Sequence, residues 1–115
     1  MKTKVTERYG AVVIELKGNV MGGEDTKEFN ELLHKLIDEG KKNIVVDLSD
    51  VKFMNSSGLG MLIGGLTTVK KSDGSFKLAR VTEKIESLLI ITKLITIFES
   101  FDSIEAAIES FGKAQ

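Results

Sequence analysis

The stretch NIVVDLSDVKFMNSSGLGMLIGG, residues 43 to 65, carries the clearest structural pattern in the chain. Its apolar run, Ile44–Leu48, is rich in β-branched side chains and predicts a buried strand. Ser56 and Ser57 come directly before apolar residues spaced three and four apart, which predict a helix from Ser57 to Lys71. The stretch therefore predicts a strand, a bend and a helix, with two serines exposed at the helix start.

The segments before this stretch predict a hairpin and a helix. Two alternating segments, Val5–Arg8 and Ala11–Lys17, lie on either side of Gly10 and suit an antiparallel pair of strands. The glycine-rich segment Gly18–Gly23 predicts a loop. An apolar stripe with helical spacing follows and ends before Gly40, which is a typical helix stop.

The segments after the stretch continue the alternation. We expect a strand at Phe76–Arg80, a helix at Glu83–Ile91, a strand at Ile95–Phe98 and a last helix carrying Ile104, Ala107, Ile108 and Phe111. Strands joined by helices of this length are typical of right-handed parallel crossovers. The predicted fold class is α/β: one domain over residues 1–115, with a mixed, mostly parallel sheet of about five strands and about four helices packed mainly on one face.

Composition and charge exclude several classes of function. The chain has 115 residues, a net charge of -1 and no cysteine. This length suits one hydrophobic core, and the near-neutral charge gives no reason to expect nucleic acid or a membrane surface as a partner. The sequence has no apolar run of about 18 residues and no apolar segment at its start, so we expect no membrane span, no secretory signal and a cytoplasmic location.

Neither the glycines nor the histidine of the chain fits a catalytic pattern. Gly58, Gly60 and Gly64 have the spacing G-x-G-x-x-x-G, which misses the dinucleotide fingerprint by one residue. Close helix packing, permitted by Gly60, Gly64 and Gly65, is therefore favoured over a phosphate cradle. His34 lies within the first predicted helix, where a surface position is favoured over a catalytic base. We expect no enzymatic activity, no metal site and no cofactor.

Asp47 and the serine pair each leave two interpretations open. Asp47 interrupts a buried strand, so it is either a functional carboxylate near the serines or a structural residue that hydrogen-bonds nearby amide groups. The hydroxyls of Ser56 and Ser57 are either helix caps or exposed phosphoacceptors, and composition alone favours capping. A phosphate at a helix start would interact favourably with the helix dipole and add about -1.5 to -2 charges to the surface.

The sequence from Phe53 to Gly60, FMNSSGLG, resembles the motif of the STAS domain, specifically that of bacterial anti-sigma factor antagonists. The strand Val45–Val51 and the strand end Leu16–Gly18 are also similar, and the resemblance covers essentially the whole chain. It implies a binding protein without enzymatic activity, which binds an anti-sigma factor that is also a serine kinase and so frees the sigma factor. The kinase then phosphorylates a motif serine, which releases the antagonist, and a serine phosphatase resets it.

The resemblance also implies which residues form the site. The expected phosphoacceptor is Ser57, directly before Gly58, with Ser56 as the second choice. The residues expected at or near the docking surface are Met21, Met54, Asn55, Gly58, Leu59, Met61 and Leu62. Exposed apolar residues near the helix start would also allow a homodimer.

Two positions depart from the family pattern. Asn55 stands where the family usually has an aspartate before the serines, and Met21 stands where the preceding loop usually has an acid. Both changes remove negative charge from the expected kinase-facing region. They favour an alternative in which the chain is a STAS scaffold or interaction module in a larger regulatory complex and is not phosphorylated. A third alternative, nucleotide binding at the Gly18–Gly23 loop, rests on analogy and loop composition.

Overall fold

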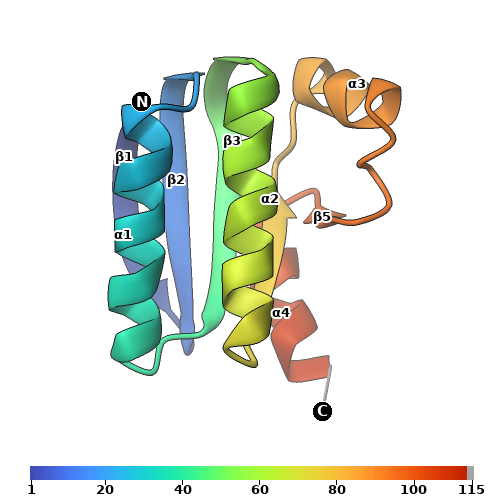
Figure 1. Ribbon diagram of the computed structural model, residues 1–115. Helices are drawn as coiled ribbons and strands as arrows, with labels where there is room; N and C mark the ends of the chain where they lie inside the picture. Colours follow the sequence, from blue (N-terminus) through green and yellow to red (C-terminus); the bar gives the residue numbers. More distant parts are fainter. Residues whose placement is uncertain (114–115) are drawn as a thin grey trace.

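The computed structural model of the protein describes residues 1–113 (Figure 1). Over these residues the chain forms five strands and four helices in the predicted order. Their bounds are β1 (Lys2–Arg8), β2 (Ala11–Val20), α1 (Glu24–Asp38), β3 (Asn43–Met54), α2 (Ser56–Lys71), β4 (Ser75–Ala79), α3 (Glu83–Ile91), β5 (Glu99–Phe101) and α4 (Ile104–Lys113).

The strands form one sheet in the order β1-β2-β3-β4-β5. β1 pairs antiparallel with β2, and each further neighbouring pair is parallel. This confirms the predicted α/β class. The turn of the β1–β2 hairpin consists of Tyr9 and Gly10, whose φ angles of 52° and 79° are both positive, as a type I′ turn requires. A tyrosine in this left-handed conformation is uncommon, because its Cβ approaches the backbone at a cost of roughly 1 kcal/mol.

The helices cover the two faces of the sheet unequally (Figure 1). α1, α2 and α3 share one face, where Phe29, Leu62 and Leu89 belong to the main hydrophobic core. α4 packs on the opposite face, where its residues Ile104 and Ala107 belong to a smaller cluster of buried residues with Val13, Val45 and Ala79. The prediction of helices mainly on one face is therefore confirmed, with α4 as the exception.

Different elements meet at the two ends of the sheet. Because β2, β3 and β4 are parallel, their carboxyl ends lie at one end of the sheet, together with the starts of α1 and α2 (top of Figure 1). The β1–β2 turn and the end of α4 lie at the other end (bottom of Figure 1). The serines of α2 and the tyrosine of the hairpin turn are thus far apart.

Several predicted boundaries need correction. β2 continues to Val20, so the predicted Gly18–Gly23 loop is shortened to residues 21–23. β3 is longer than Ile44–Leu48 and reaches Met54. β4 ends at Ala79, because the next residue has a positive φ angle.

The last strand was predicted at the wrong place: β5 is Glu99–Phe101, whereas Ile95–Phe98 lies in the connection that precedes it. The backbone amides of Leu94 and Ile95 donate to the carbonyl of Leu89 and so close the end of α3. Phe98 is buried and its ring centroid lies 6.4 Å from that of Phe76. The apolar character of this segment therefore reflects packing of a loop against the core, not strand pairing.

Candidate functional site

The first turn of α2 is capped by Asn55, not by a serine. The Asn55 side-chain oxygen accepts a hydrogen bond from the backbone N–H of Gly58 at 2.8 Å, and Asn55 itself has extended backbone angles. Ser56 and Ser57 are the first two residues of the helix, and both are exposed. The capping interpretation of the serines is therefore wrong, because an N-cap residue lies outside the helical backbone and the serines lie inside it. Their hydroxyls are left available for other chemistry.

The loop between β2 and α1 packs directly against the start of α2. A Cβ atom added to Gly22 would lie 2.6 Å from the Cβ of Ser57, and one added to Gly58 would lie 2.1 Å from the carbonyl oxygen of Val20. Only glycines permit backbones to approach this closely. This contact brings Met21, which is 45% exposed, to the same end of the molecule as Ser57, although they are distant in sequence.

The docking residues expected from the sequence divide into two groups. Met21, Asn55 and both serines lie at least partly at the surface. The side chains of four others are buried in the main core, and the structure corrects their assignment to a contact surface: Met54, Leu59, Met61 and Leu62. Gly58 is buried as well. The cause is that one stripe of α2, which includes Leu59, Met61 and Leu62, must face the core, while Met54 is the buried last residue of β3.

Phe53 is a surface residue beside the site that the family motif alone does not identify as a contact residue. It lies near the end of β3, is 41% exposed, and the Lys84 ammonium of α3 lies 5.4 Å from its ring centroid. Neighbouring residues of a strand point to opposite faces of the sheet. Because Met54 is buried in the main core, its neighbour Phe53 is expected to point away from that core, and the sequence could have indicated this. Phe53 therefore adds an exposed aromatic side chain close to the start of α2.

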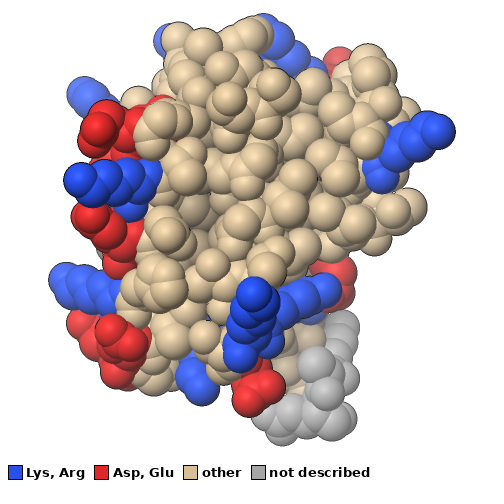
Figure 2. All heavy atoms as spheres, in the orientation of Figure 1, with Lys and Arg blue, Asp and Glu red and all other residues tan. Residues whose placement is uncertain are grey.

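The outer face of α2 is uncharged up to the last turn, where Lys70 and Lys71 follow. The sequence from Phe53 to Val69 contains no Lys, Arg, Asp or Glu. Figure 2 shows charged side chains gathered over the α1 side of this face and along its lower edge, with an uncharged surface between them. Gly60 and Gly64 are exposed on α2, and a cavity of about 190 Å³ between α1 and α2 is lined by both glycines and by Thr26 and Asn30.

Asp47 has a structural role away from the serines. It is 1% exposed and lies on the strand face of Val45, which α4 covers, whereas the main core that includes α2 lies on the other face. Its carboxylate accepts two hydrogen bonds from the Arg80 guanidinium, the Nε bond at 2.9 Å, and further ones from the backbone N–H and hydroxyl of Ser49. The hydrogen bonds from its guanidinium to the Asp47 carboxylate raise the pKa of Arg80. The structural interpretation of Asp47 is therefore the one that the structure supports.

The remaining candidates for chemistry do not form a catalytic group. His34 lies exposed on α1, as expected. Within residues 1–113, no three His, Asp or Glu side chains gather in a way that could hold a metal ion. In the same part of the chain, no helix is both long and apolar enough to cross a membrane.

Comparison with known proteins matches the chain to one family. The sequence pattern of the STAS domain matches residues 2–107. The chain is 33% identical to the anti-sigma-B factor antagonist of Bacillus subtilis over 87 residues, which cover 74% of this chain and 80% of that protein. It is 32% identical to the anti-sigma-B factor antagonist of Staphylococcus aureus over 78 residues, or 64% of this chain and 72% of the relative.

Solved structures share the fold. The Bacillus cell fate determinant SpoIIAA in its phosphorylated form superposes with a TM-score of 0.72 at 19% identity, covering 96% of this chain and 99% of that one. The anti-sigma factor antagonist SpoIIAA in its unphosphorylated form gives a TM-score of 0.71 at 17% identity, with coverages of 98% and 97%.

Proposed function

The chain belongs to the STAS domain family, and from that premise we propose that it is an anti-sigma factor antagonist switched by phosphorylation of Ser57. In this proposal it binds an anti-sigma factor that is also a serine kinase, frees the sigma factor, and is released when the kinase modifies it. A serine phosphatase resets the cycle, and the protein acts in the cytoplasm without enzymatic activity of its own. The names of its relatives and the two forms of SpoIIAA support this proposal.

The observation that carries the proposal is the cap of α2. Because Asn55 occupies the capping position, Ser57 is an exposed helical residue whose hydroxyl is not needed to begin the helix. The γ-phosphoryl group of ATP would be transferred to its Oγ, with ADP as the leaving group and the hydroxyl proton passing to a base on the kinase. The resulting phosphate would lie at the positive end of the helix dipole, which stabilises it.

Ser57 is favoured over Ser56 by its surroundings. Its Cβ lies against Gly22 of the β2–α1 loop, so a kinase that contacts both the loop and the helix reaches Ser57 between them. Ser56 shares the exposure of Ser57. The loop also presents Met21, so one docked partner could contact Met21, Asn55 and Ser57 together.

The outer face of α2 is the proposed docking surface. Gly60 and Gly64 have no atom within 4 Å of an added Cβ, and neither has a positive φ angle, so packing within the molecule does not require glycine there. Their absence of side chains lets a partner approach the helix backbone closely. The uncharged surface suits burial at an interface core, from which charged residues are usually depleted. Phosphorylation would place about two negative charges at its edge and release the partner without unfolding the domain.

The direct test is to incubate the unmodified protein with its cell's candidate anti-sigma kinases and ATP. Intact-mass spectrometry with fragmentation would then identify the modified residue. We expect one added phosphoryl group on Ser57, its loss in Ser57→Ala, and its retention in the matched control Ser56→Ala. Modification of Ser56 alone would contradict the assignment of the acceptor.

The same experiment distinguishes the alternative scaffold function. Stable binding of a candidate kinase without any modification would support a STAS interaction module that is not phosphorylated, and it would contradict the switch. Asn55→Asp then tests the cause, since it restores the acid that the family usually has while keeping a side-chain oxygen for the cap. If the kinase phosphorylates only the Asn55→Asp variant, the uncharged side chain of Asn55 is the reason that the unmodified chain is not phosphorylated.

A further inference from the structure

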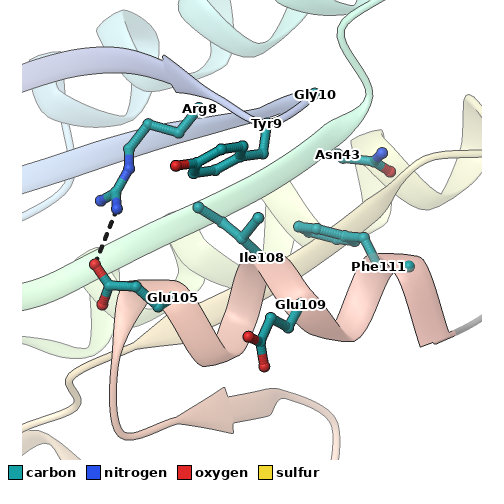
Figure 3. A pocket seen from close by; sticks show the side chains of 9 residues that line it. Arg8, Tyr9, Gly10, Asn43, Glu105, Ile108, Glu109 and Phe111 are labelled. Atoms are coloured by element: carbon teal, nitrogen blue, oxygen red, sulfur yellow. Dashed lines mark hydrogen bonds and ion pairs between the residues drawn. The ribbon is translucent and has the colours of Figure 1, made fainter.

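A cavity of about 590 Å³ lies at the opposite end of the molecule from the serines, between the β1–β2 turn and α4 (Figure 3). Tyr9 from the turn and Ile108 and Phe111 from α4 form its apolar walls. Figure 3 shows Ile108 pointing towards the tyrosine ring, and Arg8 forming an ion pair with Glu105 at the rim, at 2.9 Å. The volume falls within the range of ligand-sized pockets.

Both the backbone conformation and the exposure of Tyr9 are unfavourable for a tyrosine in the isolated molecule. It occupies the first position of a turn that prefers Asn, Asp or Gly, with a φ angle of 52°. Its side chain is also 90% exposed, so burial within the molecule does not offset the backbone strain. A contact outside the molecule would account for an aromatic residue at this position.

We propose that this face is a contact between two copies of the chain, in which Tyr9 of each copy enters the cavity of the other. A second copy is favoured as the occupant because the protruding side chain and the cavity belong to the same surface patch. In a dimer with a two-fold axis, the same patch of each copy contacts the other copy, so both tyrosines are buried and both cavities are filled. The rim carries the Arg8–Glu105 ion pair, whose side chains stay 34% and 66% exposed, and the further anion Glu109, so Arg8 of one copy can face Glu109 of the other.

This contact has a consequence for partner binding. The β1–β2 turn and the start of α2 lie at opposite ends of the sheet, so dimerisation through Tyr9 leaves Ser57 accessible on both copies (Figure 1). One dimer would present two docking sites. The contact differs from the self-association near the helix start that the sequence suggested, and it does not depend on the proposed phosphorylation switch.

The test is sedimentation equilibrium of the full chain from about 1 μM to about 1 mM. We expect a concentration-dependent dimer and, for Tyr9→Asn, a dissociation constant raised at least ~10-fold, as for loss of a central aromatic contact. Asparagine is favoured in this turn, so urea unfolding should show that the variant is at least as stable as the unmodified chain. A loss of dimer can then not be attributed to unfolding.

A matched control separates this face from another exposed apolar surface. Ile91 lies at the end of α3 and is 78% exposed, so Ile91→Asn removes a similar apolar contact far from the cavity. We expect this variant to dimerise normally. A chain that stays monomeric throughout the concentration range, or a dimer unaffected by Tyr9→Asn, would overturn the proposal. So would a dimer that only Ile91→Asn disrupts.

Discussion

The two sides of α2 carry glycines for opposite reasons. On the inner side, a Cβ atom on Gly58 would lie 2.1 Å from the Val20 carbonyl oxygen, and one on Gly65 would lie 2.7 Å from the Phe29 ring. On the outer side, a Cβ atom on Gly60 or Gly64 would meet nothing within 4 Å. All four glycines lower the intrinsic stability of the helix, by about 0.5–1 kcal/mol each relative to alanine.

The difference separates what the fold requires from what it only permits. The inner glycines let the helix approach the β2–α1 connection and the core, and so they hold Ser57 beside Gly22. The outer glycines weaken the helix without any compensating contact within the described part of the chain. Residues that reduce stability without a structural benefit are expected at functional surfaces. The comparison therefore assigns the inner pair to folding and the outer pair to partner binding, and mutations can test each assignment.

Gly58→Ala should have the largest effect of these substitutions. The added methyl group would collide with a backbone carbonyl, which cannot move aside as a side chain can, so we expect a loss of roughly 3 kcal/mol in the free energy of unfolding. Urea unfolding followed by circular dichroism measures this loss. Gly60→Ala in the same helix is the matched control. Equal stability of the two variants would remove the distinction between the inner and outer glycines.

Gly65→Ala should be destabilising to a smaller extent. Its nearest neighbours are the ends of side chains, the rings of Phe29 and Phe76 and a methyl group of Leu33, and these can move aside where a backbone carbonyl cannot. We expect a loss of about 1–2 kcal/mol in the free energy of unfolding. The double variant Gly65→Ala with Phe29→Leu tests the cause, because the smaller side chain should recover part of the loss caused by the alanine. An undiminished loss would mean that the contact with Phe29 is not the origin.

Gly60→Ala and Gly64→Ala should have the smallest effect on stability, and of opposite sign. Each should raise the free energy of unfolding by about 0.5–1 kcal/mol, since alanine is the better helix former and meets no neighbour. Binding to an anti-sigma factor should nevertheless weaken by at least ~10-fold, because the methyl group occupies the space that a close partner needs. Titration calorimetry measures the affinity. Unchanged binding by both variants would show that the outer face of α2 is not the docking surface.

Local sequence patterns were enough to predict the class of fold and the position of the serines in it. The alternation of residues in strands and the three-and-four spacing in helices are local patterns, and they predicted the α/β class and the order of elements, with every element but β5 at its place. The strand, bend and helix around residues 43–65 likewise placed the serines at the start of α2. Local patterns suffice here because each depends only on which face of an element must be buried.

Which side chains are exposed to a partner depends on contacts between elements that are distant in the sequence. The sequence predicts that α2 begins at Ser57, whereas it begins at Ser56, so the capping residue is Asn55 and not a serine. Sequence patterns do not locate the end of a helix to within one residue. The burial of Leu59 and Leu62, the pairing of Asp47 with Arg80, and the cavity between Tyr9 and α4 each depend on elements far apart in the chain. A one-dimensional pattern cannot contain these contacts, because they arise only when the helices take their places on the two faces of the sheet.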